Sequence, residues 1–350
     1  SKIVMNKIKL YLSIILIMCL QNMINAQETE IQVSKIWDQG KHNAFPDLFQ
    51  YKKYFYVAFR EGNSHVDNLN NGKVRLIRST DLKNWETIEL FEMDGVDIRE
   101  ARLSKMPDGT LLVTLAAGVW KDGQYLSLSP YVSFSDKKGE NFSVLTKTEI
   151  DSAIKPALDW IWRITWHKNT GYGILYQIYP GQRNTKNWNA FLVKTSDGIK
   201  YEKVSQLNID GNPNESTIRI DNKGKMYVLV RRESADQMGV LAKSDFPYVN
   251  WNFNKLTWRL GGPNFLFLNN DQLIIGSRYR EDKSAITALL VTDLNGNVQK
   301  IVRLPSSGDT SYPGMIIHKK QLLVVYYSSH EGKSNIYLAS IPLKNFNIKY

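Results

Sequence analysis

A short turn containing an aspartate recurs five times along this chain, and it limits the folds that the chain can adopt. In each copy a serine or threonine is closely followed by an aspartate, and in four copies an aromatic residue comes next. The copies begin at Ser79, Ser133, Thr195, Ser244 and Thr292. The aspartate can accept hydrogen bonds from its own turn, and the aromatic ring can pack that turn against a sheet. We therefore expect a β-structure assembled from repeated units.

The segments between these turns are short apolar runs separated by polar turns, and helix signals are nearly absent. The repeated units begin near Phe45, Glu100, Trp160, Glu215, Pro263 and Tyr312, at steps of 55, 60, 55, 48 and 49 residues. A propeller blade of four strands takes about 40–50 residues. The spacing predicts an all-β, six-bladed β-propeller with four antiparallel strands per blade. The last unit has room for three strands, so the segment near 30–37 is expected to supply its fourth.

The N-terminal residues have the pattern of a secretory signal. Two lysines, Lys7 and Lys9, precede an apolar run over 10–20, and Ala26 offers a small residue for cleavage. That run is too short to span a bilayer. We predict a signal peptide over 1–26, with 1–4 as an upstream extension, and a single propeller domain over 27–350. The protein is then expected in the periplasm or outside a bacterial cell.

Composition narrows the classes of partner. The formal charge is +11, and loss of three lysines with the signal would leave +8, which favours anionic partners. The single cysteine, Cys19, lies in the signal, so no disulfide is expected. We find no nucleic-acid-binding motif and no membrane span, and we expect a monomer without a cofactor. The five histidines form no ligand motif, so no metal site is expected.

The recurring Ser-x-Asp…Trp turns resemble the Asp-box, or BNR repeat, of the sialidase (neuraminidase) superfamily. The likeness extends from about Trp37 to Leu343, although the copies lack the complete Gly-x-Thr-Trp ending. The resemblance implies a six-bladed propeller that binds a glycan at one mouth of its central channel. Asp-boxes lie on the rim, far from that mouth, so the catalytic residues must be sought on the first strand of each blade.

Three further segments resemble the sialidase active site. They are Asn214-Glu215 followed by Val230-Arg231, Gly276-Ser-Arg278, and Asp309-Thr-Ser-Tyr312. The resemblance implies that Tyr312 is the nucleophile, that Glu215 takes its proton, and that Arg231 and Arg278 bind a substrate carboxylate. The chemistry is consistent, because a neutral tyrosine is not repelled by the carboxylate on the anomeric carbon of a sialic acid. Arginines bind such a carboxylate through paired hydrogen bonds.

The sequence departs from the sialidase pattern in two places. The family has an arginine at the start of the first blade, where this chain has Phe45, and Arg60 is expected to substitute for it. The family's general acid is an aspartate in the next loop, where both Asp67 and His65 are candidates. Other charged residues expected to contact substrate are Asp47, Glu61, Arg99, Glu100 and Arg163.

Three functions remain open at this stage. The first is an exo-glycosidase, similar to a sialidase, that hydrolyses a terminal acidic sugar from a glycan. The second is another propeller enzyme, either a different glycoside hydrolase or a lyase acting on a uronic-acid glycan. The third is a glycan-binding propeller without catalytic activity. A shared fold does not choose among them, because propellers carry many chemistries.

Overall fold

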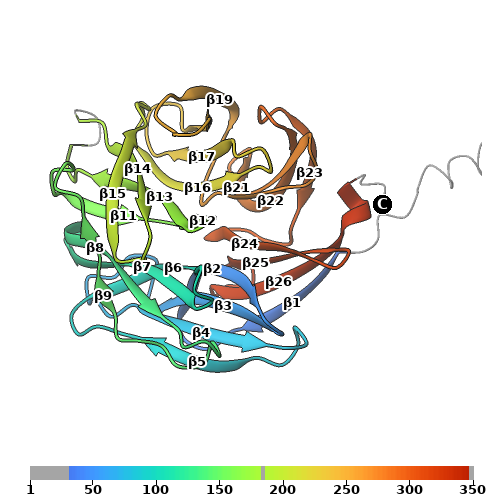
Figure 1. The fold of residues 1–350 in the computed structure, drawn as a ribbon. Coiled ribbons are helices and arrows are strands. Elements are labelled where there is room, and N and C mark those ends of the chain that lie inside the picture. The colour runs from blue at the N-terminus through green and yellow to red at the C-terminus, as the bar shows by residue number, and fades with distance from the viewer. Residues whose placement is uncertain (1–30, 183–185, 347–350) are drawn as a thin grey trace, which may run out of the picture.

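The computed structural model describes residues 31–182 and 186–346, and the predicted signal peptide lies outside them. Within this part of the chain, six β-sheets are arranged around a common axis (Figure 1). This confirms the predicted propeller. No helix among the described residues is long and apolar enough to cross a membrane.

Five blades have four antiparallel strands each. Blade one contains β2 (His42–Tyr51), β3 (Tyr54–Gly62), β4 (Lys73–Ser79) and β5 (Glu86–Phe91). Blade two contains β6 (Asp97–Lys105), β7 (Leu111–Lys121), β8 (Gln124–Phe134) and β9 (Thr146–Lys147). Blade four contains β16 (Pro213–Ile220), β17 (Met226–Arg232), β18 (Met238–Ser244) and β19 (Asn252–Arg259). Blade five contains β20 (Asn264–Phe267), β21 (Gln272–Glu281), β22 (Ser284–Asp293) and β23 (Val298–Arg303).

Blade six closes the ring. It contains β24 (Thr310–His318), β25 (Gln321–Ser328), β26 (Asn335–Pro342) and, from the other end of the chain, β1 (Gln32–Trp37). The outer strand β1 pairs antiparallel with β26, which confirms the predicted closure (Figure 1). A short 3-10 helix, Leu343–Phe346, follows β26. The pairing joins the two ends of the propeller through backbone hydrogen bonds, so the ring is closed without a disulfide.

Blade three departs from the four-strand pattern. It contains β11 (Leu158–Ile161), β12 (Thr165–His167), β13 (Thr170–Ile178), β14 (Asn189–Thr195), β15 (Lys200–Gln206) and β10 (Glu149–Ile150). The inner strand is interrupted, because both β11 and β12 pair with β13. Residues 162–164 do not pair with β13, and the side chain of Arg163 donates a hydrogen bond to Asp47 in blade one. The short β10 adds to the outer edge in parallel with β15.

The five Ser/Thr-Asp turns all lie between the third and fourth strands of blades one to five. In four of them the aspartate accepts backbone hydrogen bonds from its own turn, at Asp81, Asp136, Asp197 and Asp293. At Asp81 the donors are the amides of Asn84 and Lys83, at 2.8 and 2.9 Å, and they lower the pKa of this carboxyl. The turns therefore stabilise the outer corners of the blades.

β-Bulges in four inner strands set the direction of side chains at the centre of the molecule. The register with the second strand shifts between Ala44 and Asp47, Arg99 and Arg102, Pro213 and Ser216, and Ser311 and Gly314. The bulged segments carry Phe45, Glu100, Glu215 and Tyr312. Three of these residues have a positive φ, of 56° at Phe45, 55° at Glu100 and 51° at Tyr312. Such strained bulges re-aim side chains, and they are typical of functional sites.

The close approach of blades six and one yields a stability prediction. A Cβ on Gly314 would lie 2.3 Å from the backbone nitrogen of Leu48. Backbone cannot rotate away as a side chain can, so Gly314→Ala is expected to destabilise the fold by about 1–3 kcal/mol, the usual effect of overpacking. Thermal unfolding would measure this loss. Gly171→Ala is the control, because its nearest neighbours are side-chain atoms at 3.0 Å or more, and an equal loss in both variants would contradict the account.

Candidate active site

A tyrosine and a glutamate from different blades meet at the centre of the propeller. The hydroxyl of Tyr312 in β24 donates a hydrogen bond of 2.7 Å to Oε1 of Glu215 in β16. Both residues are buried, with 5% of the surface of each exposed. Burial and the charge of Glu215 raise the pKa of Tyr312 well above its usual value, so the hydroxyl is neutral at ordinary pH. This arrangement lets the carboxylate take the hydroxyl proton when the oxygen forms a bond.

Arg231 in β17 supplies the charge that balances Glu215. Its Nη1 lies 2.8 Å from both carboxylate oxygens of Glu215, and 3.4 Å from the hydroxyl of Tyr312. Its Nη2 pairs with Glu233 at 2.6 Å. Burial alone would raise the pKa of Glu215, but the charge of Arg231 and the hydrogen bonds from Tyr312 and Arg231 lower it below its usual range. Glu215 is therefore held ionised beside a neutral tyrosine.

Glu100, in the bulge of blade two, has a pKa shifted in the opposite direction from that of Glu215. Burial, together with the nearby charge of Glu215, raises its pKa to about 7, although Arg99 opposes the rise. Its carboxyl accepts a hydrogen bond of 3.1 Å from Nε1 of Trp162. Two neighbouring carboxyls whose pKa values are pushed apart are a common basis for separate acid and base roles. Glu100 and Glu215 form such a pair.

Phe45 lies in the bulge of blade one, at the position where the resemblance to sialidases would imply an arginine. Its side chain is fully buried, and its ring centroid lies 5.0 Å from that of Tyr312 and 5.3 Å from that of Tyr327. The guanidinium of Arg99 lies over this ring at 4.6 Å. The ring of Phe45 therefore packs against the aromatic residues beside Tyr312, and the bulge presents an apolar side chain there.

Arg278 in β21 also lies near the tyrosine, with its guanidinium 5.6 Å from the centroid of the Tyr312 ring. Its Nε donates to the carbonyl of Thr310 at 2.9 Å, and its Nη2 donates to the hydroxyl of Tyr327 at 3.0 Å. Nη2 also lies 3.6 Å from Asp309. About a fifth of the Arg278 side chain is exposed, and it lines a surface hollow of about 440 Å³ together with Lys283 and Asp309. Arg231 and Arg278 are thus more exposed than Arg99 and Arg102, the other arginines near Tyr312 among the described residues.

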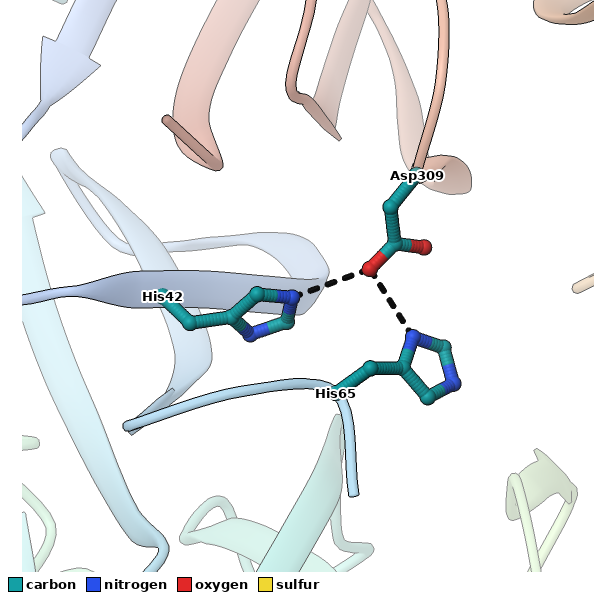
Figure 2. A group of neighbouring side chains, drawn as sticks. All are labelled: His42, His65 and Asp309. Carbon is teal, nitrogen blue, oxygen red and sulfur yellow. Dashed lines mark hydrogen bonds and ion pairs between the residues drawn. The ribbon is translucent and has the colours of Figure 1, made fainter. Parts of the chain in front are cut away.

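Two histidines and an aspartate meet next to Arg278 (Figure 2). Nε2 of His42 and Nδ1 of His65 each lie 2.9 Å from the same oxygen, Oδ2 of Asp309. The other oxygen of Asp309 accepts a hydrogen bond of 2.7 Å from Tyr327. Burial would raise the pKa of Asp309, but the hydrogen bonds from the two histidines and from Tyr327 hold it well below its usual range. This cluster could not be predicted from the sequence, because its members are far apart along the chain.

Arg60 and Arg99 are held by buried acids. Arg60 has no exposed surface, and its guanidinium bonds Asp97 at 2.7 Å and the carbonyl of Ser64 at 2.8 Å. It therefore has no surface with which to replace the missing arginine. Arg99 lies 3.4 Å from Asp97 and 3.6 Å from Glu100, and it donates to the carbonyl of His65. Arg99 thus connects the loop of His65 with the bulge of Glu100.

Four other predicted site residues lie in separate groups. Asp47 and Arg163 form a buried ion pair at 3.0 Å, and Arg163 lines a different hollow, of about 320 Å³, with Trp166. Glu61 pairs with Arg75 at 2.5 and 3.0 Å. Asp67 accepts hydrogen bonds from Asn63 and from the amide of Leu69, both in its own loop. The partners of these side chains therefore lie outside the group formed by Tyr312, Glu215 and Arg231.

Three residues of the site, Asp309, Tyr327 and Glu233, have no role among the expectations from the sequence. A weak signal existed for Asp309, which lies three residues before Tyr312. For Tyr327 and Glu233 nothing in the local sequence separates them from ordinary strand residues. Their roles follow from contacts between blades and between strands.

Comparison with known proteins gives matches at the level of structure. Neither protein-family models nor curated protein sequences match this chain. A protein of unknown function from Dyadobacter fermentans is similar in structure, with a TM-score of 0.75 and 17% identity over 89% of this chain and 99% of that one. That similarity extends over almost the whole of the Dyadobacter protein.

Two sialidases are also similar in structure. Trypanosoma rangeli sialidase has a TM-score of 0.67 and 9% identity over 89% of this chain and 59% of the sialidase. The endosialidase of phage phi92 has a TM-score of 0.66 and 10% identity over 89% of this chain and 69% of the endosialidase. The chain thus spans less than two thirds of the trypanosome enzyme. At these identities the comparisons establish that the chain shares the fold of sialidases.

The buried ion pair yields a prediction about stability. Arg231→Leu would leave Glu215 buried without its charged partner, which typically costs about 3–5 kcal/mol. We expect chemical denaturation to show a loss of this order. Arg303→Leu is the matched control, because its partner Glu281 is also a glutamate but both side chains are exposed, so we expect little change. Equal losses in the two variants would mean that Arg231 does not balance a buried charge.

Proposed function

We propose that this protein is a retaining exo-glycosidase in which Tyr312 is the nucleophile and Glu215 its base. The observation that carries the proposal is the 2.7 Å hydrogen bond from the Tyr312 hydroxyl to Glu215, between blades six and four. Such a bond is the usual geometry of a nucleophile activated by an adjacent base. Bulges position both residues, and the positive φ of Tyr312 supports a functional rather than a purely structural role.

The reaction takes place in two steps. In the first, the oxygen of Tyr312 bonds to the anomeric carbon, its proton passes to Glu215, and the bond to the leaving oxygen breaks as that oxygen receives a proton from a general acid. In the second, water attacks the same carbon and gives a proton back to the acid. The bond to Tyr312 breaks as the bond to water forms, and the tyrosine oxygen regains the proton from Glu215. Two displacements retain the configuration at the anomeric carbon.

We propose a terminal keto-sugar acid as the substrate, such as a sialic acid. The trypanosome sialidase has been solved with sialic acid and with a covalent difluorosialic acid intermediate. In this chain, Arg231 and Arg278 are the arginines placed to bind the substrate carboxylate by charge-assisted hydrogen bonds. The predicted signal peptide and the Asp-box resemblance fit a secreted member of this enzyme class.

We assign the proton donor to Glu100, in preference to Asp67 or His65. The carboxylate of Asp67 accepts hydrogen bonds within its own loop, and His65 forms a hydrogen bond with Asp309. Glu100 has a pKa raised to about 7, so a large fraction of it carries a proton at neutral pH. Its neighbour Glu215 stays ionised, and the two carboxyls can therefore serve as acid and base in one reaction.

The nucleophile is tested by release of free sugar. A panel of sialosides, uronides and neutral glycosides is incubated with the parent protein and with Tyr312→Phe. We expect the parent to release a keto-sugar acid, and the variant to lose about three or more orders of magnitude in kcat, because covalent catalysis is removed. Tyr326→Phe, at a buried tyrosine of β25 outside the cluster, is the control. A fully active Tyr312→Phe would rule out the mechanism.

The same panel of glycosides also distinguishes the proposed glycosidase from the alternative functions. Release of a uronic acid or a neutral sugar, dependent on Tyr312, would mean that the aromatic ring of Phe45 suits a different ligand. Products that absorb in the ultraviolet would indicate a lyase. Saturable binding without any product would indicate a glycan-binding propeller.

The acid is tested with leaving groups of different basicity. Glu100→Gln is expected to slow cleavage of a natural glycosidic bond about 10²–10⁴-fold, since proton donation contributes that much, and to affect an activated aryl glycoside far less. The parent's kcat/KM should fall as pH rises through about 7, because Glu100 must be protonated, and this limb should be absent in the variant. Asp67→Asn is the matched control. Loss of natural-substrate cleavage in that variant alone would transfer the role to Asp67.

A further inference from the structure

The cluster of His42, His65 and Asp309 has a composition that the glycosidase reaction does not require. His42 is the first residue of β2, His65 lies in the loop after β3, and Asp309 immediately precedes β24. One ligand atom from each of the three lies within 4.8 Å of the other two. Two imidazoles and a carboxylate are the ligand set of many zinc and other transition-metal sites that keep coordination positions open.

A hydrogen bond and ring contacts hold the side chains of this cluster in fixed orientations, as is usual for the ligands of a metal site. Oδ1 of Asp309 accepts a hydrogen bond from Tyr327, which leaves Oδ2 directed at both imidazoles. The ring of His65 packs edge-on against Phe45 at 5.0 Å, and that of His42 packs against Tyr327 at 6.4 Å. Hydrogen bonds of this kind to a ligating carboxylate orient the ligand and strengthen metal binding.

The cluster is also accessible. The side chains of His42, Asp309 and His65 are 11, 28 and 44% exposed, so the carboxylate oxygen is sheltered while one imidazole faces solvent. In Figure 2 a ring nitrogen of His42 and one of His65 both face the same carboxylate oxygen of Asp309. An ion could therefore enter from solvent and keep positions for water or for oxygen atoms of a ligand.

We propose that His42, His65 and Asp309 bind a divalent transition-metal ion such as Zn²⁺, through Nε2, Nδ1 and Oδ2. Binding requires each imidazole to present a lone pair instead of the proton that it now directs at Asp309, so the ion replaces two hydrogen bonds and two protons move or are released. The nearby guanidinium of Arg278, 3.6 Å from Asp309, opposes a cation, and we therefore expect moderate affinity. The proposal does not depend on the glycosidase reaction.

The test is a calorimetric titration of tag-free, chelator-treated protein with zinc chloride. We expect one ion per chain with a dissociation constant in the micromolar range or below, and no comparable binding of Ca²⁺ or Mg²⁺, which prefer oxygen ligands. His42→Ala and His65→Ala should each weaken binding at least about 10-fold, since each removes a ligand. His330→Ala is the control, because His330 bonds Ser328 in a hairpin and belongs to no such cluster.

A second measurement guards against variants that fail to fold. Zinc should raise the melting temperature of the parent, of His330→Ala and of Tyr312→Phe, and leave that of His42→Ala unchanged. Failure of the glycosidase proposal would leave these results intact, since Tyr312→Phe keeps all three ligands. Absence of zinc binding by the parent, or equal binding by His42→Ala and His330→Ala, would overturn the metal site. The cluster would then be a hydrogen-bonded network that positions His65.

Discussion

The ion pair between Glu215 and Arg231, with Tyr312 bonded to it, is the interaction on which the rest of the centre depends. A buried carboxylate is costly unless a charge and hydrogen bonds compensate it. Here Arg231 contacts both carboxylate oxygens at 2.8 Å and the tyrosine hydroxyl donates to one of them. Burial raises the pKa of Tyr312 and that of Glu100, and the charge of the ionised Glu215 adds to both shifts. The compensated charge of Glu215 thus contributes to the protonation of both neighbouring groups.

The propeller makes this arrangement possible through local departures from regular strands. Tyr312 and Glu100 are held at a positive φ, which few residues other than glycine adopt without strain. The surrounding ladders and the packed interfaces between blades compensate that strain. A bulge on blade one carries Phe45, whose ring packs against Tyr312 and Tyr327. A carboxylate ligand would meet two arginines that are already paired with acids, and binding must compete with those pairs.

The sequence was sufficient for the fold because the fold is periodic. The turns that begin at Ser79 and Thr195 mark the corners between third and fourth strands, and residues such as Glu215 and Tyr312 mark inner strands. Tyr312, Glu215 and Arg231 could be proposed as site residues from the sequence, since each lies in a segment that resembles the sialidase active site. It could not reveal that Arg60 is fully buried against Asp97, or that His42 and His65 share one oxygen of Asp309. Those relations depend on which side chains meet across blades, and local patterns carry no information about them.

Trapping the glycosyl-enzyme intermediate would test the proposed covalent role of Tyr312. The protein would be incubated with 2,3-difluorosialic acid and with 2,3-difluoro-KDN, and then analysed by intact-mass and peptide mass spectrometry. The account predicts one sugar adduct per chain on the peptide that contains Tyr312, and none on Tyr312→Phe. Hydrolysis of the corresponding sialoside by the parent with no adduct, or with the adduct on another residue, would contradict it.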